Sequence, residues 1–85
     1  MLSENDMLKM HEFSFGNMSE FEENKKCGCF YCCKIFDSDE IEQYISDEDG
    51  NTAVCPFCSI DSVIGEGHGF EITERLLKEL HDYWF

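Results

Sequence analysis

Basic residues are scarce in this sequence, which holds 6 Lys and Arg against 19 Asp and Glu and has a formal net charge of -13 at pH 7. Residues 37–50 contain no Lys or Arg and carry seven acids: Asp37, Asp39, Glu40, Glu42, Asp47, Glu48 and Asp49. Proteins that bind nucleic acid directly neutralise its phosphates with a basic face. The composition therefore argues against direct nucleic-acid binding. The acidity is expected either to keep the chain soluble or to steer it toward a basic partner.

The sequence also lacks a long apolar run and a basic amino-terminal segment. Its start, MLSENDMLKMHEF, carries acids and has no apolar stretch of the kind that follows the basic residues of a secretory signal. Nothing in the chain resembles a membrane span. We therefore expect a cytoplasmic protein that does not bind membranes. At 85 residues it should form a single zinc-binding domain, residues 1–85, with a small core.

Four of the six cysteines form two CxxC pairs. Cys29 and Cys32 make the first pair, and Cys55 and Cys58 make the second, which reads Cys-Pro-Phe-Cys. Six cysteines in a secreted domain would indicate three disulfides, but without an export signal reduced thiols are favoured. Two CxxC turns that face each other complete a tetrahedron of thiolates. The spacing therefore predicts a metal site made of these four cysteines.

The predicted metal is a single structural zinc ion. Four thiolates accept zinc or iron, and the iron protein rubredoxin has similar knuckles. This chain, however, has Cys33 and Ser59 where rubredoxin has glycine, and it lacks the overall rubredoxin pattern. Cys27 and Cys33 are predicted to be spare, small apolar residues, with Cys27 the better substitute for one of the four ligands.

No catalytic set is recognisable in the sequence, and a metal shell filled by four thiolates leaves no open position for a substrate. Zinc deaminases combine His-x-Glu with Pro-Cys-x-x-Cys, but His11 is followed directly by Glu12. Asp61, Ser62 and His68 can be drawn as a hydrolytic set, yet Ser62 lacks the strand-turn-helix context of a nucleophile. We therefore expect a protein that is not an enzyme.

The pattern of apolar residues predicts a small α+β fold, with a zinc-ribbon-like core of two facing CxxC knuckles, short strands and about two helices. Residues 1–9 have no clear period, so they are expected to form a mobile arm or a short helical turn. Alternation over residues 11–15 predicts a strand. Residues 19–23 are predicted to form one helical turn capped by Ser19, with Phe21 pointing inward.

Between the two knuckles, Asp37 and Glu40 resemble a capping box and predict a helix over residues 38–46. Residues 47–51 are typical of a turn, and residues 52–54 of a short strand that leads into the second knuckle.

After the second knuckle, residues 59–69 contain three glycines and are expected to be irregular. Thr73 is predicted to cap a final helix with Leu76, Leu77 and Leu80 on one face. The aromatic end of that helix is expected to pack into the core.

Several segments resemble a family of small bacterial proteins that are described only as cytoplasmic proteins. The segments are CGCFYC at 27–32, CPFCSIDSVIG at 55–65, GFEIT at 69–73 and HDYWF at 81–85, so that the likeness spans residues 13–85. The resemblance implies a bacterial cytoplasmic protein, and such proteins are found among toxin and immunity genes.

Three functions fit these observations. The favoured one is an immunity protein or antitoxin that docks an acidic face on a basic toxin nuclease and covers its substrate site. The residues predicted to bind the partner are Asp39, Glu40, Glu42, Asp47 and Glu48. Immunity proteins of nuclease colicins are similar in charge, although they share no motif with this chain. The alternatives are a nucleic-acid mimic that inhibits a DNA-binding protein, and a zinc-ribbon adaptor or accessory subunit.

Overall fold

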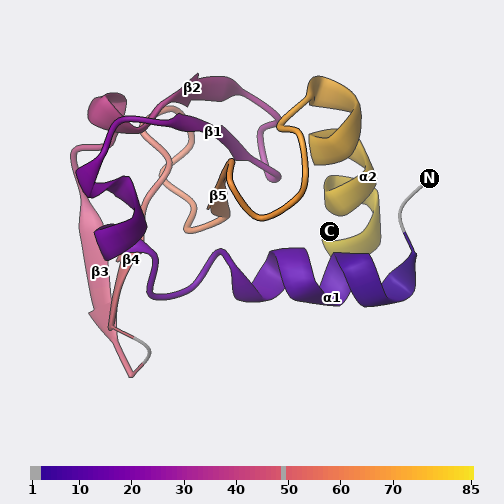
Figure 1. The fold of residues 1–85 in the computed structure, drawn as a ribbon, viewed down its shortest axis with the longest axis horizontal. Helices are drawn as coiled ribbons and strands as arrows, with labels where there is room; N and C mark the ends of the chain where they lie inside the picture. The colour runs from indigo at the N-terminus through magenta and orange to yellow at the C-terminus, as the bar shows by residue number, and fades with distance from the viewer. Residues whose placement is uncertain (1–2, 49) are drawn as a thin grey trace.

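The computed structural model describes residues 3–48 and 50–85, and Figure 1 shows the order of their helices and strands. The helices are α1 (Glu4–Glu12), α2 (Glu74–Trp84) and the short 3₁₀-helices η1 (Met18–Glu22) and η2 (Ser38–Glu40). The strands are β1 (Lys26–Cys29), β2 (Ile35–Asp37), β3 (Tyr44–Asp47), β4 (Gly50–Ala53) and β5 (Val63–Gly65). This arrangement confirms the predicted small α+β fold.

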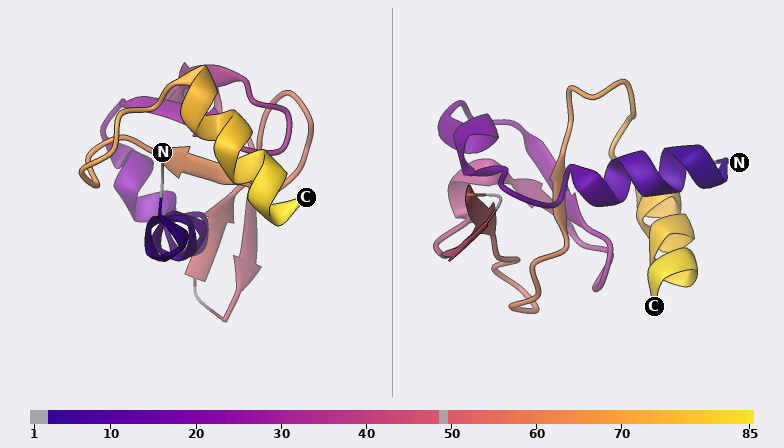
Figure 2. Two further views of the ribbon diagram at one scale, coloured as in Figure 1. Left: turned by 90° about the vertical axis from the view of Figure 1, so that its right-hand side faces the viewer. Right: turned by 90° about the horizontal axis from the view of Figure 1, so that it is seen from below.

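The strands form two separate antiparallel sheets. β1 is the middle strand of a sheet with the order β2-β1-β5, whereas β3 and β4 form a hairpin of their own. The hairpin extends from the end of the molecule opposite α2, as the views in Figures 1 and 2 show. The first CxxC segment starts at Cys29, the last residue of β1, and leads toward β2. The second lies between β4 of the hairpin and β5 of the three-stranded sheet.

Helix α2 packs closely on β1. As predicted, Thr73 caps the helix, because its side chain accepts a hydrogen bond of 3.1 Å from the amide of Leu76. The buried face includes Leu77, which lies over Gly28 of β1. A Cβ atom at Gly28 would lie 2.7 Å from Leu77 Cδ1, so any larger residue here would force the buried Leu77 side chain to move.

The amino-terminal region is more regular than predicted. Of the two alternatives for residues 1–9, a mobile arm or a short helical turn, the structure has the helical one, because residues 3–9 lie in α1 and its cap and Met7 and Met10 are buried; residues 1–2 lie outside the described part. The predicted strand over 11–15 is wrong, because α1 continues to Glu12. Side chains at positions 7, 10 and 11 share one helix face, which brings the His11 ring to 4.0 Å from that of Trp84.

The helix predicted over residues 38–46 is also wrong. The capping box does form, since the amide of Asp37 donates to the Glu40 carboxylate at 2.9 Å, but the helical turn ends after Glu40. The chain then enters β3, where pairing with β4 stabilises an extended backbone and Tyr44 packs against the core. A nine-residue helix is too short to outweigh these contacts by itself.

The remaining predicted segments are near their expected places. η1 supplies the helical turn predicted at residues 19–23 and buries Phe21, although its N-cap is Asn17 rather than Ser19. β4 covers most of the predicted strand at 52–54. β5 is a short strand within the segment predicted to be irregular.

The core has two clusters. The first joins the two helices to the three-stranded sheet and consists of Met7, Met10, Phe30, Ile64, Ile72, Leu76, Leu77 and Leu80. The second surrounds the knuckles and consists of Phe21, Cys27, Cys29, Phe36, Ile41, Ala53, Cys55 and Val63. Trp84 packs against the first cluster, but Tyr83 and Phe85 are exposed, so only part of the aromatic end packs as predicted.

Candidate metal centre

The structure brings together the four cysteines that the sequence predicts as ligands. The sulfur atoms of Cys29, Cys32, Cys55 and Cys58 all lie within 4.8 Å of one another. The Sγ–Sγ distance is 3.6 Å between Cys29 and Cys58 and 3.7 Å between Cys32 and Cys55. Four sulfurs bound about 2.3 Å from one tetrahedral ion would lie about 3.8 Å apart. The cluster therefore has the dimensions of a site that could hold a metal ion.

The two knuckles have the same backbone conformation. In the first, the amide of Cys33 donates to the carbonyl of Cys29 at 2.8 Å, and in the second the amide of Ser59 donates to that of Cys55 at 3.0 Å. The residue that closes each turn is left-handed, with φ of 63° at Cys33 and 66° at Ser59. These are the positions at which knuckles of this type often have glycine, and here a cysteine and a serine adopt the left-handed conformation.

Amide groups and burial prepare the sulfurs for a cation. Tyr31 and Phe57 each donate a backbone N–H to the sulfur two residues before them, Cys29 and Cys55, at 3.4 Å. Burial raises the pKa of Cys55 to about 11 and also raises the pKa of Cys29. Buried thiolates are therefore unfavourable by themselves, and a bound metal ion would supply the positive charge that stabilises them.

The second sulfur of the first knuckle has a different environment. Burial acts to raise the pKa of Cys32, but hydrogen bonds from the Lys34 amide and from neighbouring cysteines outweigh it, and the pKa is lowered. Cys32 therefore has more thiolate character than Cys29 and Cys55, whose pKa values are raised.

Cys27 and Cys33 lie outside the cluster, in agreement with their prediction as spare residues. Cys27 is fully buried in the second core cluster, its Sγ lies 3.6 Å from the Lys25 carbonyl oxygen, and burial raises its pKa to about 12. Cys33 packs partly against the first cluster. All six cysteines are free thiols, so the alternative of three disulfides is not what the structure has.

The acids predicted to bind a partner lie at the two ends of β3. Asp39, Glu40 and Glu42 are exposed in and after η2, and Glu48 is exposed in the turn after β3. Asp47 ends β3, and its side chain lies outside the described part of the structure. The six-residue step from Glu42 to Glu48 spans roughly 20 Å in an extended chain. The predicted residues therefore form two groups along one hairpin rather than one compact cluster.

Sequence reasoning missed the exposed aromatic side chains of the knuckles. Tyr31 is 44% exposed and Phe57 is 51% exposed, each directly before the second cysteine of its pair. Tyr31 makes an edge contact with Phe85 at 5.0 Å between ring centres, and Lys34 Nζ lies 5.3 Å from the centre of the Phe57 ring. Tyr31 and Phe57 occupy the same position in the two CxxC pairs, directly before the second cysteine. This shared position is the sequence signal from which similar exposure could have been predicted.

The hydrolytic set drawn from the sequence has no structural support. His68 Nε2 lies 2.8 Å from Glu20 Oε1, and its ring stacks on Phe13 at 3.9 Å. Ser62 is buried, and its carbonyl accepts from the Phe30 amide at 3.0 Å. His68 therefore connects the segment after β5 to η1.

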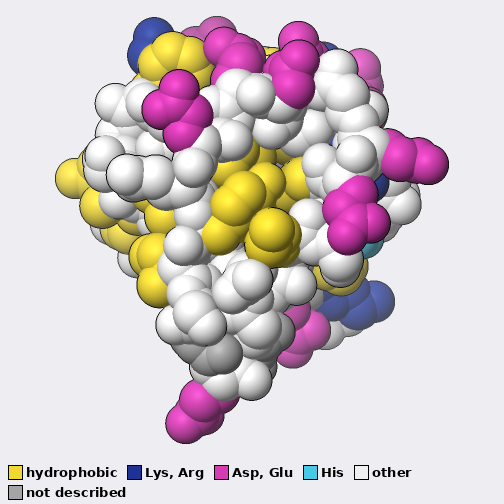
Figure 3. Space-filling model, turned by 90° about the vertical axis from the view of Figure 1, so that its left-hand side faces the viewer, with side chains coloured by type: hydrophobic (Ala, Val, Ile, Leu, Met, Phe, Trp, Pro, Cys, Tyr) yellow, Lys and Arg dark blue, Asp and Glu magenta, His cyan; other side chains and the backbone are white. Residues whose placement is uncertain are grey.

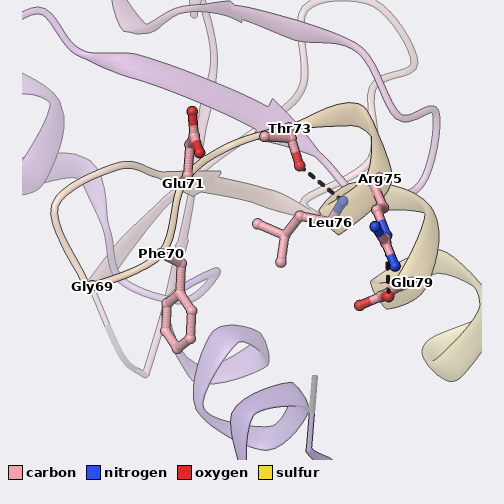
Figure 4. A pocket seen from close by; sticks show the side chains of 7 residues that line it. All are labelled: Gly69, Phe70, Glu71, Thr73, Arg75, Leu76 and Glu79. Atoms are coloured by element: carbon pink, nitrogen blue, oxygen red, sulfur yellow. Dashed lines mark hydrogen bonds and ion pairs between the residues drawn. The ribbon is translucent and has the colours of Figure 1, made fainter. Parts of the chain in front are cut away.

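A hollow of about 380 Å³ lies beside the start of α2, as Figure 4 shows. Phe70 and Leu76 supply its apolar lining. Thr73 is engaged as the helix cap, and Arg75 Nε lies 3.9 Å from Glu79 Oε1. Because Thr73 and Arg75 already have partners within α2 and the hollow is open, we assign no ligand site to it.

Comparisons with family models, curated proteins and solved structures found no match to this chain. Among the described residues, no helix has both the length and the apolar character that a membrane crossing requires. The class of protein is therefore defined by the fold and the site alone, as a small α+β protein whose two sheets meet at a four-cysteine centre.

Proposed function

We propose that this chain is an acidic, zinc-stabilised immunity protein or antitoxin that binds a basic toxin nuclease and blocks its nucleic-acid groove. The observation that carries the proposal is the net charge of -13 together with the exposed acids at both ends of β3. We call Asp39, Glu40, Glu42 and Glu48 the acidic rim. Their charge favours encounter with a positive groove and opposes contact with nucleic acid itself.

The shape of this face fits a binding role. Figure 3 shows apolar side chains gathered in the middle of the face, with acidic side chains above and beside them and at the lower tip. Exposed apolar residues on the elements of this end include Met18 of η1 and Ile45 of β3. Protein interfaces commonly combine an apolar centre with a polar edge, so the rim would steer the partner and the centre would hold it.

Zinc supports this function without taking part in catalysis. Four thiolates complete a tetrahedral shell, and zinc is the ion that most often occupies such sites in structural modules. None of the six cysteines forms a disulfide, which agrees with a reducing compartment such as the cytoplasm. A cytoplasmic place also agrees with the resemblance to proteins found among toxin and immunity genes. In this proposal the protein is a stoichiometric inhibitor and not an enzyme.

The test is the rate of association with a basic nuclease domain encoded beside the gene of this protein. The variant Asp39→Asn/Glu42→Gln/Glu48→Gln removes three rim charges and leaves Glu40, which accepts the Asp37 amide, intact. Steered association reaches about 10⁸–10⁹ M⁻¹s⁻¹ against about 10⁵–10⁶ M⁻¹s⁻¹ without steering. We expect the rim variant to associate at least tenfold more slowly at low salt and to inhibit the nuclease less.

The matched control is Glu12→Gln/Glu71→Gln/Asp82→Asn, which changes the net charge equally at exposed positions outside the rim. We expect it to associate at nearly the wild-type rate. Equal slowing by both triple variants would show that only total charge matters and would contradict the proposed face. A basic nuclease that binds without being inhibited, or inhibition of a DNA-binding protein that is not a nuclease, would replace the immunity role with one of the alternatives.

A further inference from the structure

We propose that the outer edge of β3 binds an extended, basic segment of the partner as an additional strand. This inference deepens the proposed function and rests on it, because it states how a basic partner would be held between the two acidic groups. Its basis is the hydrogen bonding of the β3–β4 hairpin.

The hairpin has one closed edge and one open edge. At the β4 edge, the amide of Gly16 donates to Thr52 Oγ1 at 2.8 Å and the amide of Ala53 donates to Asn17 Oδ1 at 2.9 Å, so the segment after α1 covers this side. β3 has β4 as its one neighbour among the described strands. The left view of Figure 2 shows the hairpin standing away from the body, with β3 at its margin.

The phase of the ladder identifies the open groups. Ala53, opposite Tyr44, sends its amide away from β3 to Asn17, and the amide of Val54 donates to the carbonyl of Gln43 at 3.0 Å. Hydrogen-bonded and non-hydrogen-bonded pairs alternate along an antiparallel ladder. Tyr44 and Ser46 therefore direct their backbone N–H and C=O groups outward, where an incoming strand could pair with them.

The surroundings of this edge define the chemistry of the segment. Glu42 and Glu48 are exposed before and after β3, and Ile45 between them is 46% exposed. A second hollow, of about 180 Å³, lies beside the start of the edge and is lined by Glu42, Gln43 and the second knuckle. It has the volume of about six water molecules, which accommodates the five non-hydrogen atoms of a lysine side chain. An extended segment with alternating basic side chains fits both features.

A second copy of this chain fits the edge poorly. Antiparallel pairing of two β3 edges would place Glu42 of one copy near Glu48 of the other, between two molecules that each carry a charge of -13. Like charges directly across a strand pair are destabilising. Acidic residues beside an open edge thus discourage self-association and leave the edge accessible to a segment of opposite charge.

The probe is a blocked peptide, acetyl-TKVKVKT-amide, tested by hydrogen exchange of individual backbone amides in the metal-loaded protein. We expect exchange at Tyr44 and Ser46 to slow at least tenfold with the peptide, while Ala53, which already bonds to Asn17, changes little. The same peptide N-methylated at the residues that pair with β3 keeps its charge but loses its donors, and it should give no protection. Equal protection by both peptides, or none by the first, would overturn the inference.

A protein variant gives an independent test. Ser46→Pro removes an outward N–H without removing a bond to β4, and proline is tolerated on edge strands; Ser46→Thr is the matched control that keeps the N–H. We expect Ser46→Pro, with wild-type metal content, to bind the peptide at least tenfold more weakly than Ser46→Thr. If the rim variant slows association with the nuclease but Ser46→Pro binds the peptide as tightly as Ser46→Thr does, the edge inference fails and the proposed function stands. If the rim charges prove irrelevant to the nuclease while the peptide protects Tyr44 and Ser46, the proposed function fails and the edge site stands.

Discussion

Replacement of Cys55 by serine should unfold a large part of this protein. Cys55 is buried, lies 3.7 Å from Cys32 across the cluster, and joins the connection after β4 to the turn after β1. An uncharged serine is a poor substitute for a thiolate ligand. The change would therefore break the link between the two sheets.

The magnitude depends on the size of the domain. At roughly 0.05–0.15 kcal/mol per residue, a chain of this length has a stability of about 4–13 kcal/mol. Structural zinc sites contribute about 10–16 kcal/mol of apparent binding free energy near neutral pH. Loss of the proposed zinc is thus comparable to the whole stability. The second core cluster, which contains Cys29 and Cys55, should be lost first, because the first cluster contains none of the four ligands.

The assay combines zinc release, followed with a metal-sensitive dye, with amide NMR spectra of the wild type, Cys55→Ser and the control Cys33→Ser. We expect Cys55→Ser, or the wild type after a strong chelator, to lose the dispersed signals of β3 and β4. Cys33→Ser should retain both metal and spectrum, because Cys33 lies outside the cluster. Wild-type spectra after complete removal of zinc would refute the idea that the metal holds the fold together.

Two further predictions concern single residues. Ser59 is exposed and has a φ of 66°, in the left-handed region that favours glycine. Ser59→Gly should therefore be about 0.5–1 kcal/mol more stable than Ser59→Ala in chemical denaturation. Equal denaturation midpoints of the two variants would contradict backbone strain at this position. Burial lowers the pKa of His11 below its usual 6.5, against opposing contributions from Asp61 and Glu12, so the neutral form is favoured in the folded state. The contribution of His11 to stability should be full above pH 6.5 and should decrease as pH falls through 6.5 toward the lowered folded pKa. His11→Gln should show a smaller fall in melting temperature between pH 7.5 and 5.5 than the wild type, and equal falls would contradict this assignment.

The ligand set and the final helix were predictable because their signals are local. A CxxC turn fixes two sulfurs within four residues, and the spacing of Leu76, Leu77 and Leu80 after a Thr73 cap specifies one helix face. These features depend little on the rest of the chain, so the structure retains them.

The β3 edge and α1 were missed because distant contacts decide their conformation. The capping box at Asp37 and Glu40 is real, but it stabilises a single turn, and the pairing of Tyr44 with Ala53 makes the next segment a strand. The Asp-Gly dipeptide at positions 49 and 50 of the sequence is also a hairpin signal, which would have predicted two strands rather than a helix and one strand. In α1, Met7 and Met10 are buried by side chains from distant parts of the chain, including Leu77 and Leu80 of α2, so the local sequence alone does not predict their burial.

The joining of α1 and α2 has a consequence for the synthesis of the chain. Met7 near the start and Leu80 near the end belong to the same core cluster, and Tyr83 Oη donates to the Glu4 carboxylate at 3.1 Å. Translation at about 5–20 residues per second needs roughly 3 to 12 s to make the intervening residues 13–73. During that time the apolar face of α1 lacks the partners that α2 supplies, Leu76, Leu77 and Leu80. A nascent molecule should therefore leave this face partly exposed to chaperones or proteases until translation reaches α2.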